Sequence, residues 1–298
     1  MMRSYPYRIL NVFAESDFGG NPLCVFEHAE GLSDAEMQAL ALQFNLSETT
    51  FILPSDTATA RMRIFTPGTE MAFAGHPSIG TAHVVSALCH VGDAAGDALT
   101  LECKAGIVPL NLHDQVWTFA APQAVQTREC EVSPAEIARL LGLCEDDLLS
   151  APLWVSTGSD QLLVALKTSD AVRRARPDAT LLDIWPVSSL GRRTAYLFAF
   201  GAADGVDADV ASRQPVTTRY FFVRPEGGVG EDPATGSACA NLGGWWLTSG
   251  RDLPVSFVVE QGVQMRRPSQ LYLDVALDKT IRVGGKVVEI GRGMIQIS

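Results

Sequence analysis

The sequence is poor in cysteine, has no long apolar run and contains fewer basic than acidic residues, and each shortage excludes a class of protein. Six cysteines are spread over 298 residues and no two of them form a C-x-x-C pair, which excludes a disulfide scaffold and predicts buried, reduced thiols. No segment approaches the ~20 apolar residues that a bilayer span requires. The first residues also show no apolar block followed by a cleavage site. We therefore expect a soluble, cytoplasmic protein without a membrane partner.

The charge balance limits the class of partner. The chain contains 23 Lys and Arg against 34 Asp and Glu, a net charge of −11. An acidic protein is not a general nucleic-acid binder, although a locally positive pocket still allows a small anionic substrate. Apolar residues make up 47% and charged residues 19% of the chain, as in ordinary globular proteins, and the length fits one large domain or two of ordinary size.

No motif predicts a metal or a cofactor. His76, His83 and His90 fall seven residues apart, and seven residues of helix span about 10.5 Å, too far for two ligands of one ion. The stretch "VGGKVVEIGRG" lacks the Walker spacing, "GGVG" is not a dinucleotide fingerprint, and there is no G-x-S-x-G elbow. We expect neither a metal nor a cofactor.

Two capping boxes predict two similar helix starts. Ser33 is followed by Glu36, and Ser133 by Glu136, each ahead of apolar residues at helical spacing. They predict one helix over about residues 33–44 and another that begins after Ser133. Each is followed later by an alternating strand that ends at a proline, "ARMRIFTP" in the first case and "TRYFFVRP" in the second. A further strand, "TAYLFAFGA", is expected in the second half.

A short motif, P-x-x-G-[ST]-A, also occurs twice. Its copies are Pro77–Ala82 and Pro233–Ala238, preceded by His76 and by Asp232. Three features in the same order predict a diverged internal duplication. A boundary near residues 118–128 then separates the halves, and both ends of the chain are rich in predicted strands.

Each copy of the motif predicts a helix whose proline stands in the first turn. The start of a helix presents unpaired backbone N–H groups, which bind a carboxylate or an enolate oxygen. Small residues such as Gly80 and Gly236 would let a ligand approach that backbone. Close packing between helices explains small residues equally well in either copy taken alone. Two copies, each beside a titratable residue, favour binding.

Three side chains are candidates for acid–base chemistry. His76 and Asp232 precede the two predicted helices at matching places. Glu48 lies where the first predicted helix leads into the apolar strand "FIL". It is either a solvated turn residue or a half-buried carboxyl with a raised pKa, suited to exchange a proton with carbon. Cys239 is expected to be a small buried apolar residue rather than a nucleophile.

The chain resembles the PhzF family over most of its length. The resemblance rests on four blocks: "NVFAESDFGGNPLCVF", "FNLSETTFILP", "RIFTPGTEMAFAGHPSIGTAH" and "GEDPATGSACANLG". It implies an α+β fold like that of diaminopimelate epimerase, in which each of two pseudo-symmetric halves wraps mixed and antiparallel strands around a central helix. The halves are then residues 1–120 with a returning strand at 287–298, and residues 121–286, with the active site in the cleft between them.

The resemblance also implies isomerase chemistry without a cofactor, and a possible homodimer. The acid/base glutamate of the family matches Glu48, its histidine matches His76, and its aspartate and serine match Asp232 and Ser237. The helix starts at Gly75–His76 and Gly236–Ser237 are expected to hold a small anionic, carboxylate-bearing substrate. The expected substrate-binding residues are Gly75, Thr235, Gly236 and Ser237.

The expected chemistry uses one base rather than two thiols. Related racemases place a cysteine in each half of the cleft, whereas "FAGHP" and "DPATG" contain none. This favours a base that returns the proton to the same face of the substrate. Two alternatives remain open at this point: a member of the fold that binds a small molecule or a protein without catalysis, and an epimerase or lyase that uses the same proton abstraction.

Overall fold

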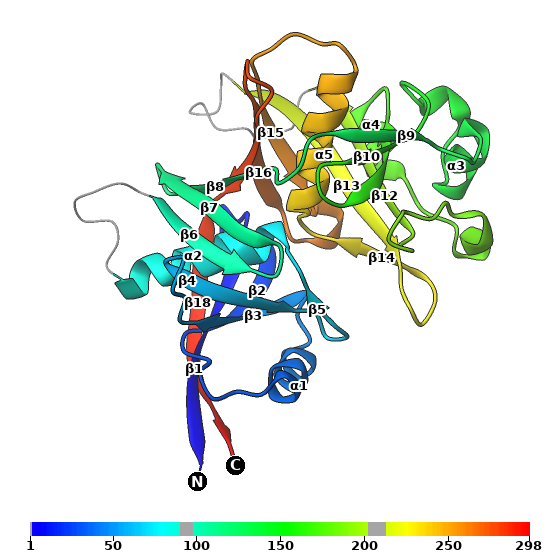
Figure 1. The fold of residues 1–298 in the computed structure, drawn as a ribbon. Helices are drawn as coiled ribbons and strands as arrows, with labels where there is room; N and C mark the ends of the chain where they lie inside the picture. Colours follow the sequence, from blue (N-terminus) through cyan, green and yellow to red (C-terminus); the bar gives the residue numbers. More distant parts are fainter. Residues whose placement is uncertain (1, 90–97, 202–212) are drawn as a thin grey trace. The chain divides into compact units, whose positions relative to one another are not determined.

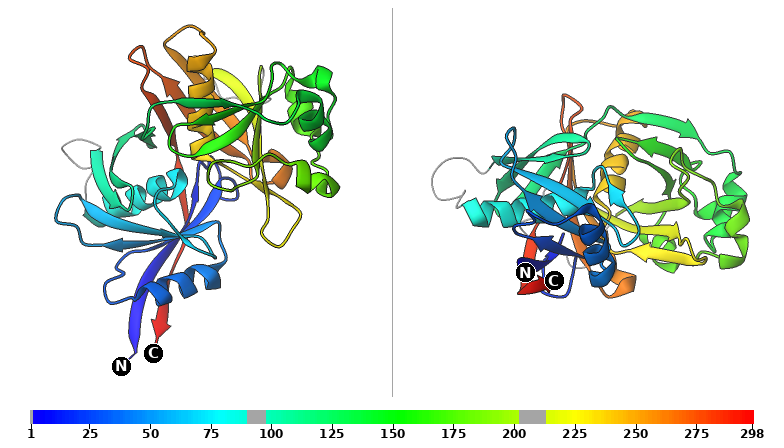
Figure 2. Two further views of the ribbon diagram at one scale, coloured as in Figure 1. Left: turned by 45° about the vertical axis from the view of Figure 1, so that its right-hand side comes forward. Right: turned by 60° about the horizontal axis from the view of Figure 1, so that its bottom comes forward.

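The computed structural model describes residues 2–89, 98–201 and 213–298. By its internal contacts the chain divides into two compact units, Met1–Ala120 with Gly284–Ser298, and Ala121–Val283. In each unit, strands wrap around one helix, α2 (Gly75–Cys89) in the first and α5 (Gly236–Thr248) in the second (Figures 1 and 2).

The first unit is a mixed sheet folded around α2. Its neighbouring strands pair antiparallel, except that β2 pairs in parallel with β3, and β4 with β6. At the end of the chain β18 pairs antiparallel with β1, so the two termini lie side by side (Figure 1). Helix α2 contacts β1, β2, β3, β4, β6, β7, β8 and β18. The elements are β1 (Arg3–Val12), β2 (Asn21–Phe26), α1 (Asp34–Phe44), β3 (Glu48–Leu53), β4 (Ala60–Phe65), β5 (Glu70–Met71), α2, β6 (Ala98–Cys103), β7 (Gly106–His113), β8 (Val116–Ala120) and β18 (Val287–Ile297).

The second unit repeats this plan around α5. Its elements are β9 (Gln126–Glu129), α3 (Pro134–Leu140), η1 (Glu145–Asp147), β10 (Leu153–Ser156), β11 (Asp160–Ala165), α4 (Ser169–Arg174), η2 (Ala179–Ile184), β12 (Thr194–Phe200), β13 (Gln214–Val223), β14 (Val229–Asp232), α5, β15 (Val255–Gln261), η4 (Val263–Met265) and β16 (Ser269–Val275). The chain passes back to the first unit within β17 (Ile281–Gly285).

The order of parallel and antiparallel pairs is the same in both units. Strand β10 pairs antiparallel with β9 and β11, β11 pairs in parallel with β12, and β13 pairs antiparallel with β12 and β14 and in parallel with β15. Parallel neighbours need a crossover connection, and a helix lies in each such connection, α1 and α2 in the first unit and α4 and α5 in the second. The predicted architecture of two similar α+β halves is therefore confirmed.

The two predicted capping boxes form as expected, but their helices do not hold matching places: α1 leads from β2 to β3, and the corresponding connection from β11 to β12 holds α4 rather than α3. The Ser33 hydroxyl accepts a hydrogen bond from the backbone N–H of Glu36, whose carboxylate accepts one from the N–H of Ser33. Ser133 and Glu136 make the same pair of bonds at the start of α3. These local contacts satisfy N–H groups that a helix start leaves open.

Strand pairing shows which residues of the two units correspond. Phe65 of β4 pairs with Glu70 of β5, and Phe221 of β13 pairs with Glu231 of β14. The following helix begins five residues after that glutamate in both units. Each position of α2 therefore corresponds to the same position of α5.

This correspondence corrects the alignment of the two P-x-x-G-[ST]-A motifs. Pro77 is the third residue of α2, whereas Pro233 lies three residues before α5 begins, so the motif alignment is wrong by five residues. The residue of α5 that corresponds to His76 is Ser237, and the expectation that His76 and Asp232 hold matching places is also wrong. Proline and small residues recur near helix starts for local reasons, whereas correspondence is set by strand register.

Gly80 is small because the protein core lies against it. It is the sixth residue of α2 and is buried, as are Thr81 and Ala82. A Cβ at Gly80 would lie 2.4 Å from Leu23 Cδ2 and 3.0 Å from Val12 Cγ2. The interpretation that these small residues admit a ligand is therefore wrong for this copy, and close packing is the reason.

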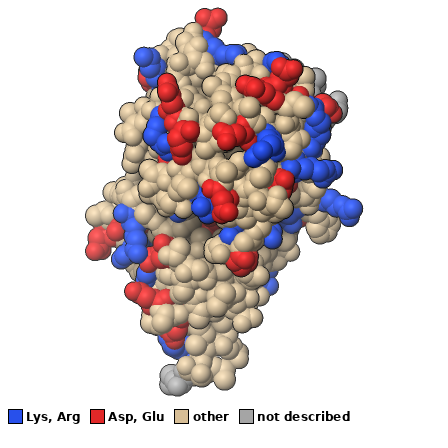
Figure 3. Space-filling model, turned by 90° about the vertical axis from the view of Figure 1, so that its right-hand side faces the viewer, with Lys and Arg blue, Asp and Glu red and all other residues tan. Residues whose placement is uncertain are grey.

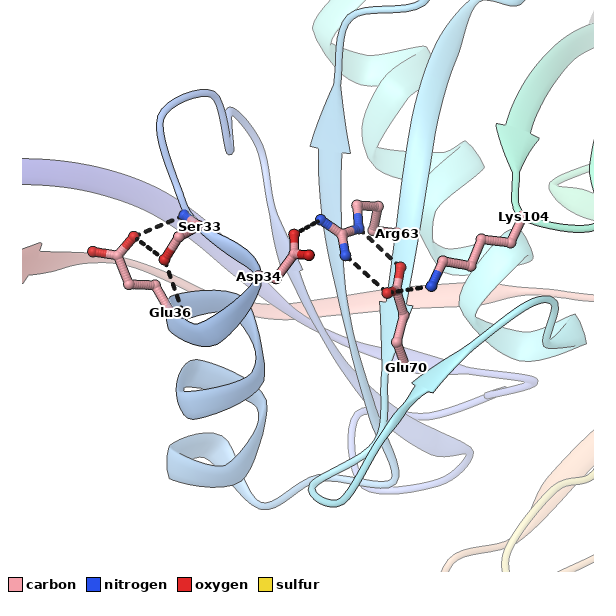
Figure 4. A network of polar contacts seen from close by, with 6 residues as sticks. All are labelled: Ser33, Asp34, Glu36, Arg63, Glu70 and Lys104. Atoms are coloured by element: carbon pink, nitrogen blue, oxygen red, sulfur yellow. Dashed lines mark hydrogen bonds and ion pairs between the residues drawn. The ribbon is translucent and has the colours of Figure 1, made fainter.

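A partly buried arginine–glutamate pair fixes the hairpin ahead of the central helix in each unit. Arg63 donates to both carboxylate oxygens of Glu70 at 2.8 Å, and also to Asp34 at 2.6 Å (Figure 4). These hydrogen bonds from Arg63 hold the pKa of Glu70 below its usual value. Arg219 likewise donates to both oxygens of Glu231, at 2.9 and 2.8 Å. Each pair thus ties the hairpin that leads into α2 or α5 to the strand before it.

The charged side chains are mixed by sign on the face of the molecule that Figure 3 shows, where Lys and Arg lie next to Asp and Glu. The net charge of −11 is therefore not gathered into one acidic field on this face. None of the helices in the described part of the chain combines the length and the apolar character that a membrane crossing takes.

Candidate active site

Glu48 is the first residue of β3, directly after the turn that ends α1. Asn45 closes that helix in the left-handed conformation, with φ of 51°, and its N–H donates to the carbonyl of Ala41. Glu48 then pairs with Leu23 of β2 in the sheet. Its side chain is only 15% exposed, which rules out a fully solvated turn residue.

His76, the second residue of α2, faces this carboxyl. Its Nε2 lies 3.4 Å from Glu48 Oε2, and its side chain is 6% exposed. Burial lowers its pKa from 6.5 to about 3, and a backbone hydrogen bond with Pro22 opposes this shift. The imidazole is therefore neutral at neutral pH.

The proton of this imidazole can be placed. Proline has no N–H, so the ring must donate to the carbonyl of Pro22. Nε2 has no hydrogen-bond partner, so Nδ1 is the donor. A neutral imidazole has one donor and one acceptor nitrogen, and Nε2 thus carries its lone pair towards Glu48. A protonated carboxyl oxygen 3.4 Å away can donate a hydrogen bond to that nitrogen.

In the second unit, Asp232 is the last residue of β14 and Thr235 is the N-cap residue of α5. The Thr235 hydroxyl donates to the Asp232 carboxylate and makes no capping bond to the helix. The buried amide of Gln261 accepts from the N–H of Thr235 at 3.3 Å and donates to the Asp232 carbonyl at 2.8 Å. The cap side chain is thereby turned away from the first N–H groups of the helix.

Ser237 is the second residue of α5 and is partly exposed. Its Oγ accepts a hydrogen bond from Gln161 Nε2 at 3.1 Å. Neither Gln161 nor Gln261 is a sequence-derived candidate. The available signal is a polar amide in a mostly apolar strand, "DQLLVA" for Gln161 and "VSFVVEQ" for Gln261.

The predicted site residues thus fall into two groups. Glu48, Gly75 and His76 lie together in the first unit, and Asp232, Thr235, Gly236 and Ser237 lie together in the second. That both groups face one cleft stays a prediction.

The thiols of the two central regions are poorly suited to proton transfer. Cys239 in α5 and Cys24 in β2 are fully buried, and desolvation raises the pKa of both thiols well above the usual value. Within the described residues, no three His, Cys, Asp or Glu side chains gather as metal ligands would. His83 lies in α2 next to the buried Arg8, and His90 lies outside the described residues.

Comparison with known protein families identifies the family of the chain. Residues 10–293 match the family described as Phenazine biosynthesis-like protein, PhzC-PhzF. The chain belongs to the PhzC-PhzF family.

Several relatives of this PhzF-family protein are named isomerases. It is 37% identical over 295 residues to an uncharacterized isomerase of Pasteurella multocida, covering 98% of this chain and 94% of the relative. It is 34% identical over 273 residues to trans-2,3-dihydro-3-hydroxyanthranilate isomerase of Pseudomonas aeruginosa, covering 89% of this chain and 88% of the relative. With relatives of these names over nearly its whole length, the protein is an isomerase.

Solved structures agree on the fold. A PhzF-family phenazine biosynthesis protein of Bacillus anthracis matches with a TM-score of 0.81 and 25% identity, covering 99% of this chain and 100% of that one. A hydroxyproline epimerase from Agrobacterium vitis, at a TM-score of 0.59 and 13% identity over 99% and 93% of the two chains, shares the fold alone. The predicted epimerase-like α+β fold is confirmed.

Proposed function

We propose that this isomerase works without a cofactor and moves a proton on a small carboxylate-bearing substrate, with Glu48 as the acid and base. The observation that carries the proposal is the 3.4 Å separation between Glu48 Oε2 and Nε2 of the buried, neutral His76. A half-buried carboxyl beside a nitrogen lone pair is suited to hold a proton between two transfer steps.

The proposed reaction needs two proton transfers by one residue. Glu48 removes a proton from a carbon of the substrate, and the electron pair moves into the conjugated system towards the carboxylate. Glu48 then returns the proton to another carbon on the same face. His76 accepts a hydrogen bond from the protonated Glu48 in the interval, because its Nε2 is the acceptor nitrogen.

The start of α5 is the proposed site for the negative charge. Its cap side chain is engaged with Asp232, which leaves the N–H groups of the first turn and the Ser237 hydroxyl to stabilise a carboxylate or an enolate oxygen. Gly75 and the start of α2 are proposed to act in the same way. Asp232 is proposed to orient donor groups of the substrate. In this proposal both groups share one cleft between the halves.

The proposed substrate class follows from a relative. The Pseudomonas aeruginosa relative is named for trans-2,3-dihydro-3-hydroxyanthranilate. A cyclic unsaturated acid of this kind has the conjugated system and the carboxylate that the proposed transfer requires. We propose that the substrate is this compound or another small unsaturated acid.

The test follows deuterium exchange from deuterated water into trans-2,3-dihydro-3-hydroxyanthranilate and a panel of small unsaturated acids, read by mass. In Glu48→Gln we expect exchange to fall about 10²–10⁴-fold, as for loss of a general base. Glu129→Gln is the matched control, because Glu129 is exposed on β9, and it should exchange at the wild-type rate. Undiminished exchange in Glu48→Gln would refute the role of Glu48.

A further inference from the structure

A buried chain of hydrogen bonds runs from the interior of the second unit to Ser237. Asn241 of α5 donates through Nδ2 to the carbonyl of Val155 at 2.7 Å and to that of Ser159 at 2.8 Å. Gln161 Oε1 is a third acceptor that faces Asn241 Nδ2, so the two hydrogens of that amide are shared among three oxygens, and Gln161 Nε2 donates to Ser237 Oγ at 3.1 Å. Asn241 is fully buried and Gln161 is 3% exposed.

The direction of every bond in this chain is determined by the backbone. A carbonyl oxygen only accepts, so the atom of Asn241 that faces Val155 and Ser159 must be the nitrogen. Thr157 Oγ donates to Asn241 Oδ1 at 2.8 Å on the other side, in agreement. The Gln161 atom that faces the Asn241 nitrogen must then be the oxygen, because two facing donors repel.

The direction of these hydrogen bonds determines whether the Ser237 hydroxyl is a donor or an acceptor towards a ligand. Gln161 presents its NH₂ group to Ser237, so Ser237 Oγ is an acceptor in that bond. A hydroxyl carries one donor hydrogen in addition to its lone pairs, and this hydrogen must point away from Gln161. Ser237 is partly exposed, so its hydrogen is available to an oxygen of a ligand at the start of α5.

The first unit provides an internal comparison. Thr49 pairs with Phe65 and Ala195 pairs with Phe221, so Thr49 and Ala195 hold corresponding positions in the two units. Their neighbours on the next strand are Cys24 and Leu162, which therefore also correspond. The preceding residues, Leu23 and Gln161, then form a corresponding pair.

Gly80 and Asn241 are likewise both the sixth residue of their helix. The first unit thus carries an apolar leucine–glycine pair where the second carries a buried glutamine–asparagine pair, so the fold does not require the amides. Buried amides cost free energy of desolvation that their hydrogen bonds only offset.

We propose that Gln161 and Asn241 are positioning residues that set the Ser237 hydroxyl as a hydrogen-bond donor to an anionic oxygen of the substrate. The inference rests on the proposed function and deepens it. It assigns to these two amides the preference of the site for a deprotonated acid over an uncharged molecule. Neither amide touches the reacting atoms in this proposal; both act through Ser237.

The test is a double-mutant cycle on ligand affinity with the full chain. The variants are Gln161→Met, which keeps the volume and removes the amide, Ser237→Ala, and the two combined. The probe is anthranilate, with anthranilamide as its uncharged counterpart, and Kd is measured by titration calorimetry. Gln161→Leu combined with Asn241→Gly reproduces the leucine–glycine pair of the first unit. It removes both amides and is the variant to use if Gln161→Met does not fold.

We expect Gln161→Met to weaken anthranilate binding about 5- to 10-fold, the size of one lost hydrogen bond. It should weaken anthranilamide less, because bonds to a charged acceptor are stronger. In the Ser237→Ala background, Gln161→Met should have no further effect, which a merely structural role would not produce.

Two results would overturn the inference. Equal losses from Gln161→Met in both backgrounds, or an unchanged Kd, would mean that Gln161 does not act through Ser237. If the wild-type protein binds no anthranilate, the proposed carboxylate site is absent and this inference is wrong. The exchange test of Glu48 would still decide the proposed chemistry.

Discussion

The buried imidazole of His76 should make the stability of the protein depend on pH. In the folded chain burial lowers its pKa from 6.5 to about 3, whereas in the unfolded chain it is solvated and titrates near its ordinary value. Between these two values the unfolded state binds one more proton than the folded state. The free energy of unfolding therefore falls as the pH falls from about 6.5 towards 3 and is fully present above about 6.5.

The size of the effect follows from the same two values. Each pH unit between them changes the free energy of unfolding by about 1.4 kcal/mol for one such group. From about pH 8 to about pH 4.5, two units below the unfolded pKa, His76 should contribute a loss of about 3 kcal/mol. Carboxylates held in ion pairs add losses at lower pH, so the contribution of His76 must be read as a difference between variants.

The assay is urea unfolding of wild type and His76→Gln across this pH range. Removing the imidazole should flatten the profile by about 3 kcal/mol, whatever its effect on absolute stability at pH 8. His113→Gln is the control, because the His113 side chain is 86% exposed, and its profile should follow the wild type. Parallel profiles for wild type and His76→Gln would show that the folded protein protonates His76 readily, and the argument for a neutral imidazole would be wrong.

Three further predictions concern packing and burial. Arg219→Met should lower the free energy of unfolding by up to about 3–5 kcal/mol, since it leaves the half-buried Glu231 carboxylate without its guanidinium. Adding Glu231→Leu should recover part of that loss in urea unfolding. Gly80→Ala should cost about 1–3 kcal/mol because of its contact with Leu23, and Leu23→Ala should relieve the clash in the same assay; additive losses would contradict this. Cys239 should stay unmodified by iodoacetamide in the native protein and react after unfolding, as read by peptide mass, because the thiol is buried and its pKa is raised; rapid native labelling would contradict this.

Helix starts were predictable because their signals are local. The capping boxes of α1 and α3 join residues three apart in the chain, and both formed as predicted. The starts of α2 at Gly75 and α5 at Gly236 also agree with the predicted helix starts, although Pro233 lies before α5 and not in its first turn as predicted.

The correspondence between the halves was not predictable from the motif. Pro77 and Pro233 look alike in the sequence, but strand pairing separates them by five positions. Register is a property of two strands together, and no short stretch records it.

The buried polar side chains were missed for the same reason. Gln161 and Asn241 are 80 residues apart, and Gln261 meets Thr235 across 26 residues. Each is an ordinary amide in the sequence, and its role exists only where folding brings its partners into contact.

By itself, the sequence determined the α+β class, the two capping boxes and the residues that match the family, because these depend on local spacing and on recognisable blocks. Of the three features that predicted the duplication, only the strands β4 and β13 correspond in the structure. Only the tertiary structure decided that Glu48 is half-buried beside a neutral His76, that Gly80 is packed by the core, and that Ser237 accepts from Gln161. Burial, pKa and the direction of a hydrogen bond depend on atoms contributed by distant parts of the chain, and these become neighbours only in the folded protein.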